Sequence, residues 1–266
     1  MFPRLFHIGS FYLPTYGVLV AAGALIGIWI SVRNAEKQGT DGDEAWNLSI
    51  LVVLAGIIGA KILYVINDWS FYSNNWREIF SINTLQAGGV FSGGLIGALL
   101  MGVWYMRRHH MPALRFTDAA APGVAFAHIL GRFGCFSAGC CYGRPTHHFW
   151  GVVFTNPLAH EVSGTPLGVR IEPTQLIEAA AEFFNFLVLT WLFKRKKFDG
   201  QVFGSFMILY GVERYFIEFL RGDPGRGEVF GGLMTGTQLI AILLVVGGGL
   251  IWWLKSSRQP SAISSQ

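Results

Sequence analysis

Seven stretches of the chain are continuously apolar, and polar or charged residues separate them. They are residues 16–31, 46–66, 88–106, 117–138, 173–193, 202–220 and 233–254. A helix needs about 20 apolar residues to cross the hydrocarbon core of a membrane. Because the runs are continuous and do not alternate, they predict helices and not the strands of a barrel. The pattern predicts an all-α, polytopic membrane protein with seven transmembrane helices in a single domain over residues 1–255.

The basic residues that flank these stretches predict the orientation of the chain. Lys and Arg gather after the first, third, fifth and seventh stretch, and such residues concentrate on the cytoplasmic side of a membrane. The N-terminus is therefore expected outside the cytoplasm, with residues 1–15 at the membrane interface. The C-terminus is expected inside, with residues 256–266 as a cytoplasmic tail. On this topology the long connection 139–172 forms a small extracytoplasmic head.

Composition narrows the class of protein further. Of the 266 residues, 14% are charged and 52% hydrophobic, and the mean hydropathy is +0.43. About 25% of the residues of a soluble domain are charged, so disorder and an ordinary water-soluble enzyme are both excluded. The net charge of +4 follows from the membrane topology, and no nucleic-acid partner is expected.

Ionisable residues inside the apolar stretches are functional candidates, because a charge is costly there. Arg132 follows an apolar run in the fourth stretch. Tyr210, Arg214 and Glu218 recur at every fourth position, so they form one polar stripe on a helix. Arg221 extends this stripe by a turn. Arg214 and Glu218 could be a structural pair within one helix, but a second arginine in another span favours an anion site.

The third apolar stretch opens with a glycine-rich segment, residues 88–97. Its glycines let another backbone or a lipid headgroup approach closely, and a free helix N-terminus binds anions. Packing of small residues between helices is the alternative. Arginine binds phosphate oxygens in pairs through its planar fork and keeps its charge. The glycine segment and the two arginines together predict a pocket for a phosphate ester.

The order of these motifs resembles that of the bacterial prolipoprotein diacylglyceryl transferases, over nearly the whole chain. The matching motifs are Tyr16-Gly17, Gly93-Gly94-Leu95-Ile96-Gly97, Gly131-Arg132-Phe133-Gly134, Pro173-Thr174-Gln175-Leu176 with Glu178, and Tyr210-Gly211 followed by Arg214, Glu218 and Arg221. The resemblance implies a seven-helix, multi-pass enzyme of the bacterial inner membrane with its N-terminus outside. It implies transfer of the diacylglyceryl group of phosphatidylglycerol to the lipobox cysteine thiol in the signal peptide of an exported prolipoprotein. This reaction forms a thioether and releases glycerol phosphate. The implied partners are that phospholipid, the prolipoprotein and other membrane lipids, and no metal or organic cofactor is implied.

The resemblance also implies roles for single residues. Arg132 and Arg214 would hold the lipid phosphate and stabilise its charge as it leaves. Glu218 would orient Arg214 or accept a proton, while Tyr16 and Tyr210 would offer hydroxyl groups to headgroup or ester oxygens. The further substrate-binding candidates are Ser92, Gly93, Gly94, Cys135, Gly143 and Arg221.

The chain departs from the family pattern at two places. The family has Asn-Phe-x-Asn-Gly-Glu after Gly-Arg-x-Gly, where this chain has Cys135-Phe136-Ser137-Ala138-Gly139-Cys140. The family has His before its Gly-Gly-Leu-Ile-Gly block, where this chain has Ser92. The residue usually taken as the base is therefore absent. His128 lies four residues before Arg132 and is a candidate substitute, with a core histidine bonded to a backbone carbonyl as the alternative.

All three cysteines, Cys135, Cys140 and Cys141, lie in the altered stretch. They could be small buried residues, or two of them could form a disulfide on an extracytoplasmic face. A metal site with His147 and His148 lacks the usual paired spacing of ligands. Cys140 is also a candidate nucleophile that accepts the diacylglyceryl group first.

Two other functions stay open on the sequence alone. One is a transferase with the same lipid donor and a different acceptor, which the missing Asn, His and Glu suggest. The other is a transporter or lipid-binding protein that uses the arginines as an anion seat without chemistry.

Overall fold

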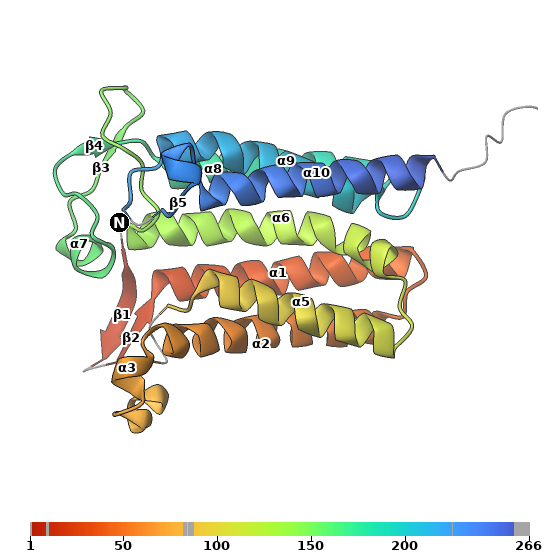
Figure 1. Ribbon diagram of the computed structural model, residues 1–266, viewed down its shortest axis with the longest axis horizontal. Coiled ribbons are helices and arrows are strands. Elements are labelled where there is room, and N and C mark those ends of the chain that lie inside the picture. The colour runs from red at the N-terminus through yellow and green to blue at the C-terminus, as the bar shows by residue number, and fades with distance from the viewer. Residues whose placement is uncertain (1, 9–10, 82–83, 85–87, 225, 258–266) are drawn as a thin grey trace, which may run out of the picture. The chain divides into compact units, whose positions relative to one another are not determined.

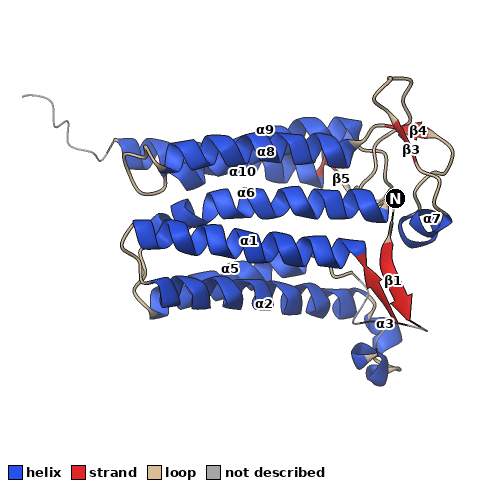
Figure 2. Ribbon diagram, turned by 180° about the vertical axis from the view of Figure 1, so that it is seen from behind, coloured by secondary structure: helices blue, strands red, loops and turns tan. Residues whose placement is uncertain are grey.

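The computed structural model describes residues 2–8, 11–81, 84, 88–224 and 226–257. In this part of the chain the fold is all-α apart from three two-stranded antiparallel sheets, as Figure 2 shows. The helices divide into two compact units, Met1–Asn34 with Thr117–Gln266 and Ala35–Phe116. The predicted tail lies almost wholly outside the described residues.

The larger unit (Met1–Asn34 and Thr117–Gln266) contains most of the long helices of the described chain (Figure 1). They are α1 (Thr15–Lys37), α6 (Ala113–Ala138), α8 (Thr174–Phe193), α9 (Gln201–Ile217) and α10 (Gly236–Ser256). Short elements join them: β1 (Arg4–Ile8), β2 (Phe11–Pro14), β3 (Val152–Val153), α7 (Pro157–Ser163), β4 (Arg170–Ile171), η2 (Glu218–Leu220), β5 (Glu228–Val229), η3 (Phe230–Gly232) and β6 (Met234–Thr235). The smaller unit contains α2 (Gly42–Asn67), α3 (Trp69–Tyr72), η1 (Trp76–Phe80) and α5 (Phe91–Arg108).

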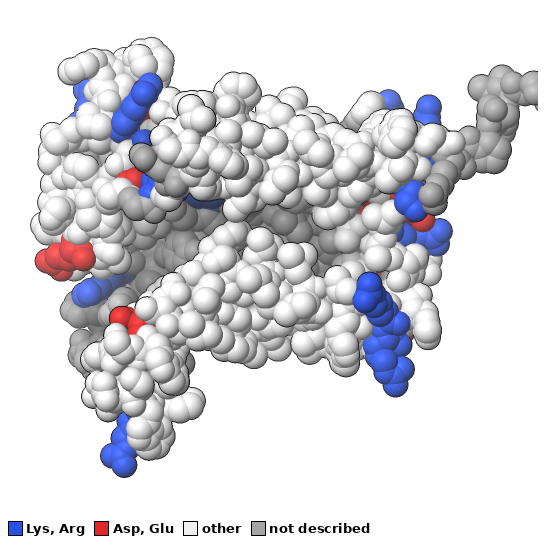
Figure 3. All heavy atoms as spheres, in the orientation of Figure 1, with Lys and Arg blue, Asp and Glu red and all other residues white. Residues whose placement is uncertain are grey.

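Five of the described helices are long and apolar enough to cross a membrane, namely α1, α2, α6, α8 and α10. The other two predicted spans also form helices, α5 with 18 residues and α9 with 17, but they do not meet the same criterion. Large apolar side chains lie exposed along the helices, and the face drawn in Figure 3 shows Lys and Arg gathered near helix ends. The structure thus confirms an all-helical protein with several candidate spans, and the count of seven stays a prediction.

Buried residues at the start of α6 join it to α8 and α9. Ala121 and Ala125 pack with Leu189 and Val202 in one apolar cluster. Asp118, which is fully buried, accepts hydrogen bonds at 2.8 Å from the backbone N–H groups of Gly200 and Phe203. The first N–H groups of a helix have no partner within it, so this carboxylate caps α9. Lys196 lies 2.9 Å from Asp118 and offsets its buried charge.

The first helix approaches α6 through glycines. A Cβ atom on Gly27 would lie 2.7 Å from the carbonyl oxygen of Gly123, and one on Gly23 would lie 2.9 Å from that of Ala127. The two backbones are therefore close, as in helix pairs packed through small residues in membranes. Before α1, the strands β1 and β2 pair in antiparallel fashion, in the segment that the sequence predicts at the membrane interface.

The connection between α6 and α8, residues 139–172, has a small core of its own and is called the head segment below. Tyr142, Phe154, Ala159 and Ile171 pack together there. The short strands β3 and β4 pair in antiparallel fashion through Val152 and Ile171. Asn156 caps the N-terminus of α7, where its side chain accepts a hydrogen bond from the Leu158 N–H. Figures 1 and 2 show these elements beside the end of α6 and the start of α8.

Candidate functional site

Arg132 and Arg214 meet at one buried carboxylate inside the larger unit. Arg132 comes from the last turns of α6, Arg214 from α9 and Glu178 from the second turn of α8. Arg132 Nη2 lies 2.6 Å and Arg214 Nε 3.7 Å from Glu178 Oε1. The Glu178 side chain has no exposure, and the two arginine side chains are 12% and 11% exposed. The structure thus brings the two predicted phosphate ligands together through a carboxylate.

The polar stripe of α9 continues into a second group of charges. Arg214 Nη2 lies 3.4 Å from Glu218 Oε2, at the first residue of η2. Glu218 also accepts a hydrogen bond from Thr235 Oγ1 at 2.7 Å and is ion-paired with Arg226. The pair within one helix exists, as the structural alternative predicts, but it is the longest contact of this carboxylate and is part of a larger network.

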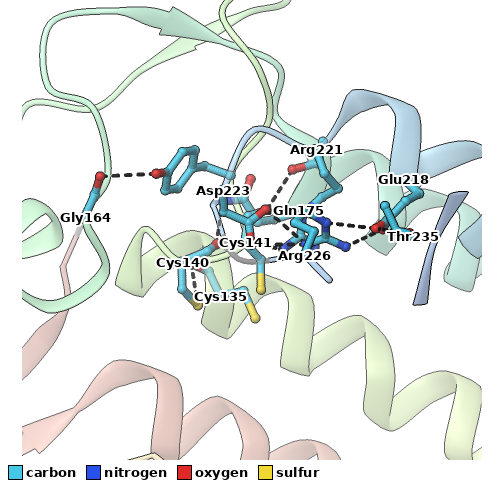
Figure 4. Close-up of polar contacts among 12 residues, drawn as sticks. Cys135, Cys140, Cys141, Gly164, Gln175, Glu218, Arg221, Asp223, Arg226 and Thr235 are labelled. Atoms are coloured by element: carbon cyan, nitrogen blue, oxygen red, sulfur yellow. Dashed lines mark hydrogen bonds and ion pairs between the residues drawn. The ribbon is translucent and has the colours of Figure 1, made fainter. Parts of the chain in front are cut away.

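Arg221 and Arg226 share one further carboxylate. Arg221 binds Asp223 through two hydrogen bonds of 2.7 Å each, and Arg226 Nη1 lies 3.1 Å from the same group. Figure 4 shows this bridge between Glu218 and Asp223. The ion-paired network holds four guanidinium groups and three carboxylates, since Glu178, Glu218 and Asp223 face the four arginines. One positive charge is in excess within it.

Gly143 joins three distant segments beside this network. Its N–H donates to the carbonyl of Glu172, and it forms an antiparallel bridge with Arg221. The neighbouring Arg144 N–H donates to the carbonyl of Leu220 at 2.9 Å. A Cβ atom on Gly143 would lie 2.6 Å from Glu172 Cβ and 2.9 Å from the Leu220 carbonyl oxygen. A glycine is therefore required here by close approach, and its bridge holds the Arg221 backbone against the loop that follows α6.

The three cysteines form one cluster at this junction. Their sulfur atoms all lie within 4.8 Å of one another, and all three thiols are free. Cys135 is buried in the last turn of α6, while Cys140 and Cys141 are partly exposed. Arg221 also donates a hydrogen bond to the side chain of Cys141. The disulfide that the sequence permitted is not formed, and the cluster offers three sulfur ligands to a metal.

The pKa values of the cysteine thiols are shifted in opposite directions. The pKa of Cys141 lies below its ordinary value because the Cys135 and Cys140 thiols bond to it and the charges of Arg221 and Arg132 favour its thiolate, which together outweigh burial. The same hydrogen bonds and burial raise the pKa of Cys140. The surroundings therefore favour the thiolate at Cys141 over Cys140, whereas the sequence singled out Cys140 as the candidate nucleophile.

Both tyrosines pack against α6, the helix that carries Arg132. Tyr16, 42% exposed, packs on the last turns of α6, where a Cβ atom on Gly134 would lie 3.1 Å from its ring. Tyr210 packs between Phe206 and His128 on α9 and α6. His128 Nδ1 lies 2.8 Å from Glu182 Oε1. The histidine is thus paired with a buried carboxylate, and the expected bond to a backbone carbonyl is not its contact.

The glycine-rich segment lies in the smaller unit. Gly93 is buried against α2, where a Cβ atom on it would lie 2.6 Å from Leu63 Cβ, and one on Gly94 would lie 3.1 Å from the carbonyl oxygen of Gly56. Ser92, one residue earlier, is exposed. Helix packing accounts for both glycines, and the substrate-binding role of Ser92, Gly93 and Gly94 stays a prediction.

A pocket of about 360 Å³ opens beside the head segment. It is lined by His148, Trp150, Glu172, Pro173, Ile177 and Leu220. Glu172 accepts hydrogen bonds from His148 and Trp150 at 2.8 and 2.9 Å. Burial raises the pKa of Glu172, but hydrogen bonds from Thr146, His148 and Trp150 outweigh it and hold the pKa below the usual range. Leu220, which lines the pocket, directly precedes Arg221 in the chain. The pocket is therefore adjacent to the charged network.

Sequence reasoning missed several members of this site. Arg226, Asp223 and Thr235 lie in loops and short strands, outside the apolar stretches in which a charge is informative. The one available signal for Arg226 was a charge in a turn that follows the α9 stripe. Glu178 was noted within a motif, but no role for it followed, because only the fold shows that it faces both arginines.

The arrangement can bind an anion and hold it still. Arg132 Nε and Arg214 Nη1 are buried donors without a hydrogen-bond partner among the described residues. An unpaired buried donor costs about 1–3 kcal/mol, so these two groups favour a ligand with acceptor oxygens. Their guanidinium planes are fixed by Glu178 and Glu218, which is the preorganisation that stabilises charge in a transition state.

Comparison with known proteins gives a family for this architecture. A family model described as prolipoprotein diacylglyceryl transferase matches residues 3–254. The phosphatidylglycerol–prolipoprotein diacylglyceryl transferase of Clostridium tetani is 34% identical over 249 residues, which are 93% of this chain and 95% of the relative. The enzyme of that name from Clostridioides difficile is 32% identical over 94% of each chain, and transferase 2 of Clostridium perfringens is 34% identical over 90% of this chain and 89% of the relative. The chain belongs to the prolipoprotein diacylglyceryl transferase family.

Proposed function

We propose that this protein transfers the diacylglyceryl group of phosphatidylglycerol to the lipobox cysteine thiol of exported prolipoproteins. The observation that carries the proposal is the pair of buried arginines with unpaired donors, Arg132 Nε and Arg214 Nη1. A phosphodiester headgroup has the oxygens that these donors lack. The names of the relatives, which match about nine-tenths of the chain, support the same substrates.

In this mechanism the arginines act on the leaving group. The acceptor sulfur attacks the glyceryl carbon that carries the phosphate, the carbon–oxygen bond breaks, and glycerol phosphate leaves with the electron pair. Arg132 and Arg214 would stabilise the phosphate as its charge grows. Glu178 and Glu218 would hold the guanidinium planes, and Arg221 with the Tyr16 and Tyr210 hydroxyl groups would contact the headgroup.

The proposed topology places this site at the outer face of the bacterial inner membrane. Seven spans, with α5 and α9 among them, put the ends of α6 and α9 and the starts of α8 and α10 on one side, away from the Lys and Arg clusters. The bonds of Gly143 to Glu172, of Arg144 to Leu220 and of Thr235 to Glu218 support that shared side. The apolar pocket beside Leu220 would receive an apolar side chain of the signal peptide.

The test is a single reaction read by peptide mass. Purified protein is incubated with phosphatidylglycerol vesicles and a synthetic lipobox peptide, with the Cys→Ser peptide as control. We expect a gain of one diacylglyceryl group that needs the peptide cysteine and falls at least a hundredfold in Arg132→Ala and in Arg214→Ala. Glu161→Ala, an exposed change in the head segment, should leave the rate unchanged. Release of glycerol phosphate with no modified peptide would show a different acceptor, and full activity in both arginine variants would overturn their roles.

A further inference from the structure

The cysteine cluster has the dimensions of a metal site. Zinc binds thiolates at about 2.3 Å, so three sulfur atoms on one ion lie about 4 Å apart. Here all three sulfur atoms lie within 4.8 Å of one another, on the last turn of one helix and the loop that follows it. In the described residues this cluster is also the one group of His, Cys, Asp and Glu side chains with such spacing.

The backbone is held in an unfavourable conformation to build the cluster. Cys141 has a φ of +62°, a left-handed conformation that costs about 1–2 kcal/mol for a residue with a Cβ atom. Thr174 and Gln175, at the start of α8, hold this turn by donating to the carbonyls of Cys141 and Cys140 at 2.8 Å each. A glycine would adopt this turn without strain. A cysteine at position 141 therefore costs conformational free energy that a glycine would not. Strain of this kind points to a functional side chain.

The surroundings suit a thiolate–metal centre better than an apolar core. Arg221 bonds to the Cys141 side chain, and Arg132 acts on Cys135 and Cys141 through its charge. A zinc ion with three thiolates carries a net charge of −1, which the neighbouring guanidinium groups offset. A disulfide is the poorer use of these groups, because adjacent cysteines such as Cys140 and Cys141 would be strained and one thiol would remain.

We propose that Cys135, Cys140 and Cys141 bind one zinc ion whose fourth position receives the thiol of the acceptor peptide. The role of the acceptor rests on the proposed function. Catalytic zinc sites have three protein ligands and an open position, and a thiol that binds there loses its proton. The resemblance to the family implied no metal, but this chain lacks the usual His and Glu, and the zinc site would replace the missing base.

The reaction balances without any further reagent. The peptide thiol binds the ion and releases its proton to solvent. The bound sulfur then donates an electron pair to the glyceryl carbon, forming the carbon–sulfur bond as the carbon–oxygen bond breaks. Glycerol phosphate departs with the bonding pair and its charge is held by Arg132 and Arg214. The thioether product carries no charge, binds zinc weakly and dissociates.

The first experiment measures metal binding by the full-length protein in detergent. The chelator-treated protein is titrated with zinc and, separately, with cobalt(II), whose thiolate charge-transfer band counts sulfur ligands. We expect one equivalent of either ion, and loss of binding by at least a hundredfold in Cys135→Ser and Cys141→Ser. His147→Ala should bind as the unchanged protein does, because His147 lies outside the cluster. Binding of copper(I) alone, or no stoichiometric binding, overturns the proposal.

The second experiment tests the fourth position and needs no variant that could misfold. The lipobox peptide should shift the cobalt spectrum, and the Cys→Ser peptide should not. Chelation should lower thioether formation at least tenfold, and one equivalent of zinc should restore it. Equal rates before and after chelation would overturn the zinc site and leave the transferase standing. A cobalt spectrum that responds to the peptide thiol, with no thioether in any state, would uphold the site and overturn the proposed function.

Discussion

Glu178 is the residue on which both candidate phosphate-binding arginines converge. It is fully buried, and Arg132 and Arg214 approach the same carboxylate oxygen. Removing one partner of a buried ion pair is more costly than the pair itself is stabilising, because the remaining charge has no compensation. A lipid phosphate, when bound, would supply part of that compensation.

The first prediction concerns this carboxylate. Glu178→Gln keeps the shape of the side chain but removes its charge, so we expect a loss of about 3–5 kcal/mol in stability, measured by thermal unfolding in detergent. The control is Glu161→Gln, exposed in the head segment, for which a change within about 0.5 kcal/mol is expected. Anionic lipid should recover part of the loss at Glu178 only. Equal melting temperatures for both variants would contradict the role of Glu178.

The second prediction concerns the acidity of Cys141 in chelator-treated protein. Its pKa is lowered by the other two thiols and by the charges of Arg221 and Arg132, so its reactive thiolate persists below the ordinary cysteine pKa of about 8.5. Alkylation by iodoacetamide, followed by peptide mass against pH, should modify Cys141 before Cys135 and Cys140. Arg221→Gln should move the midpoint to higher pH, and Arg221→Lys, which keeps the charge, should move it less. A Cys141 midpoint at or above the ordinary value would refute this.

At the scale of elements, the site depends on close backbone contact between segments far apart in sequence. The loop after α6, residue Glu172 before α8 and the end of η2 with Arg221 bond to one another around Gly143. These contacts leave no room for a side chain. The positions of Arg221 and of the cysteines relative to α8 therefore depend on one glycine.

The third prediction compares two glycines of the same region. Gly143→Ala would place a Cβ atom against the Glu172 and Leu220 backbone, so we expect at least a tenfold loss of transfer and faster proteolysis of the head segment. Gly131→Ala meets nothing within 4 Å and lies inside α6, where Ala is favoured over Gly by about 1 kcal/mol. It should retain activity and stability. Similar transfer activity of the two variants in the mass assay would show that close backbone approach does not require a glycine at position 143.

The fourth prediction tests helix packing in the smaller unit with two glycine variants, one at a packed position and one at an open position. In Gly93→Ala the new Cβ atom would meet the backbone of Gly59 and the side chain of Leu63 on α2, whereas Gly88 has nothing within 4 Å. We expect Gly93→Ala to lower the melting temperature and Gly88→Ala to leave it unchanged. An unaffected melting temperature in Gly93→Ala would instead favour a substrate role for this glycine, which the activity assay would then detect.

At the scale of the whole molecule, charge position predicts orientation. Arg107 and Arg108 lie in the last turn of α5 and Lys255 in that of α10, and the basic residues 194–197 follow α8. The positive-inside rule then predicts that the head segment lies outside and the C-terminus in the cytoplasm.

The fifth prediction tests this orientation with reporters. Green fluorescent protein fused after Gln266 should fluoresce, and alkaline phosphatase at the same place should be inactive. Alkaline phosphatase fused after Gly164 in the head segment should be active. The same reporter active at both places would mean an even number of crossings between them instead of the predicted three, and would overturn the seven-span topology.

Much of the site could be predicted from the sequence, because a charged residue inside a membrane-spanning stretch is costly and therefore indicates a function. Arg132, Arg214 and Glu218 stand out since a charge in an apolar stretch needs a reason, and the helices follow from continuous apolar runs. The seven runs all became helices. The spacing of four residues also predicted the contact between Arg214 and Glu218.

The tertiary structure alone decided which of these groups meet. Nothing in the spacing of residues shows that Glu178 faces two arginines, that Arg226 reaches Glu218, or that His128 pairs with Glu182. Three cysteines in seven positions were visible, but their convergence depends on a left-handed turn held by the start of α8. Local periodicity determines helices and their faces, whereas contacts between elements depend on packing and loop paths that no single segment encodes.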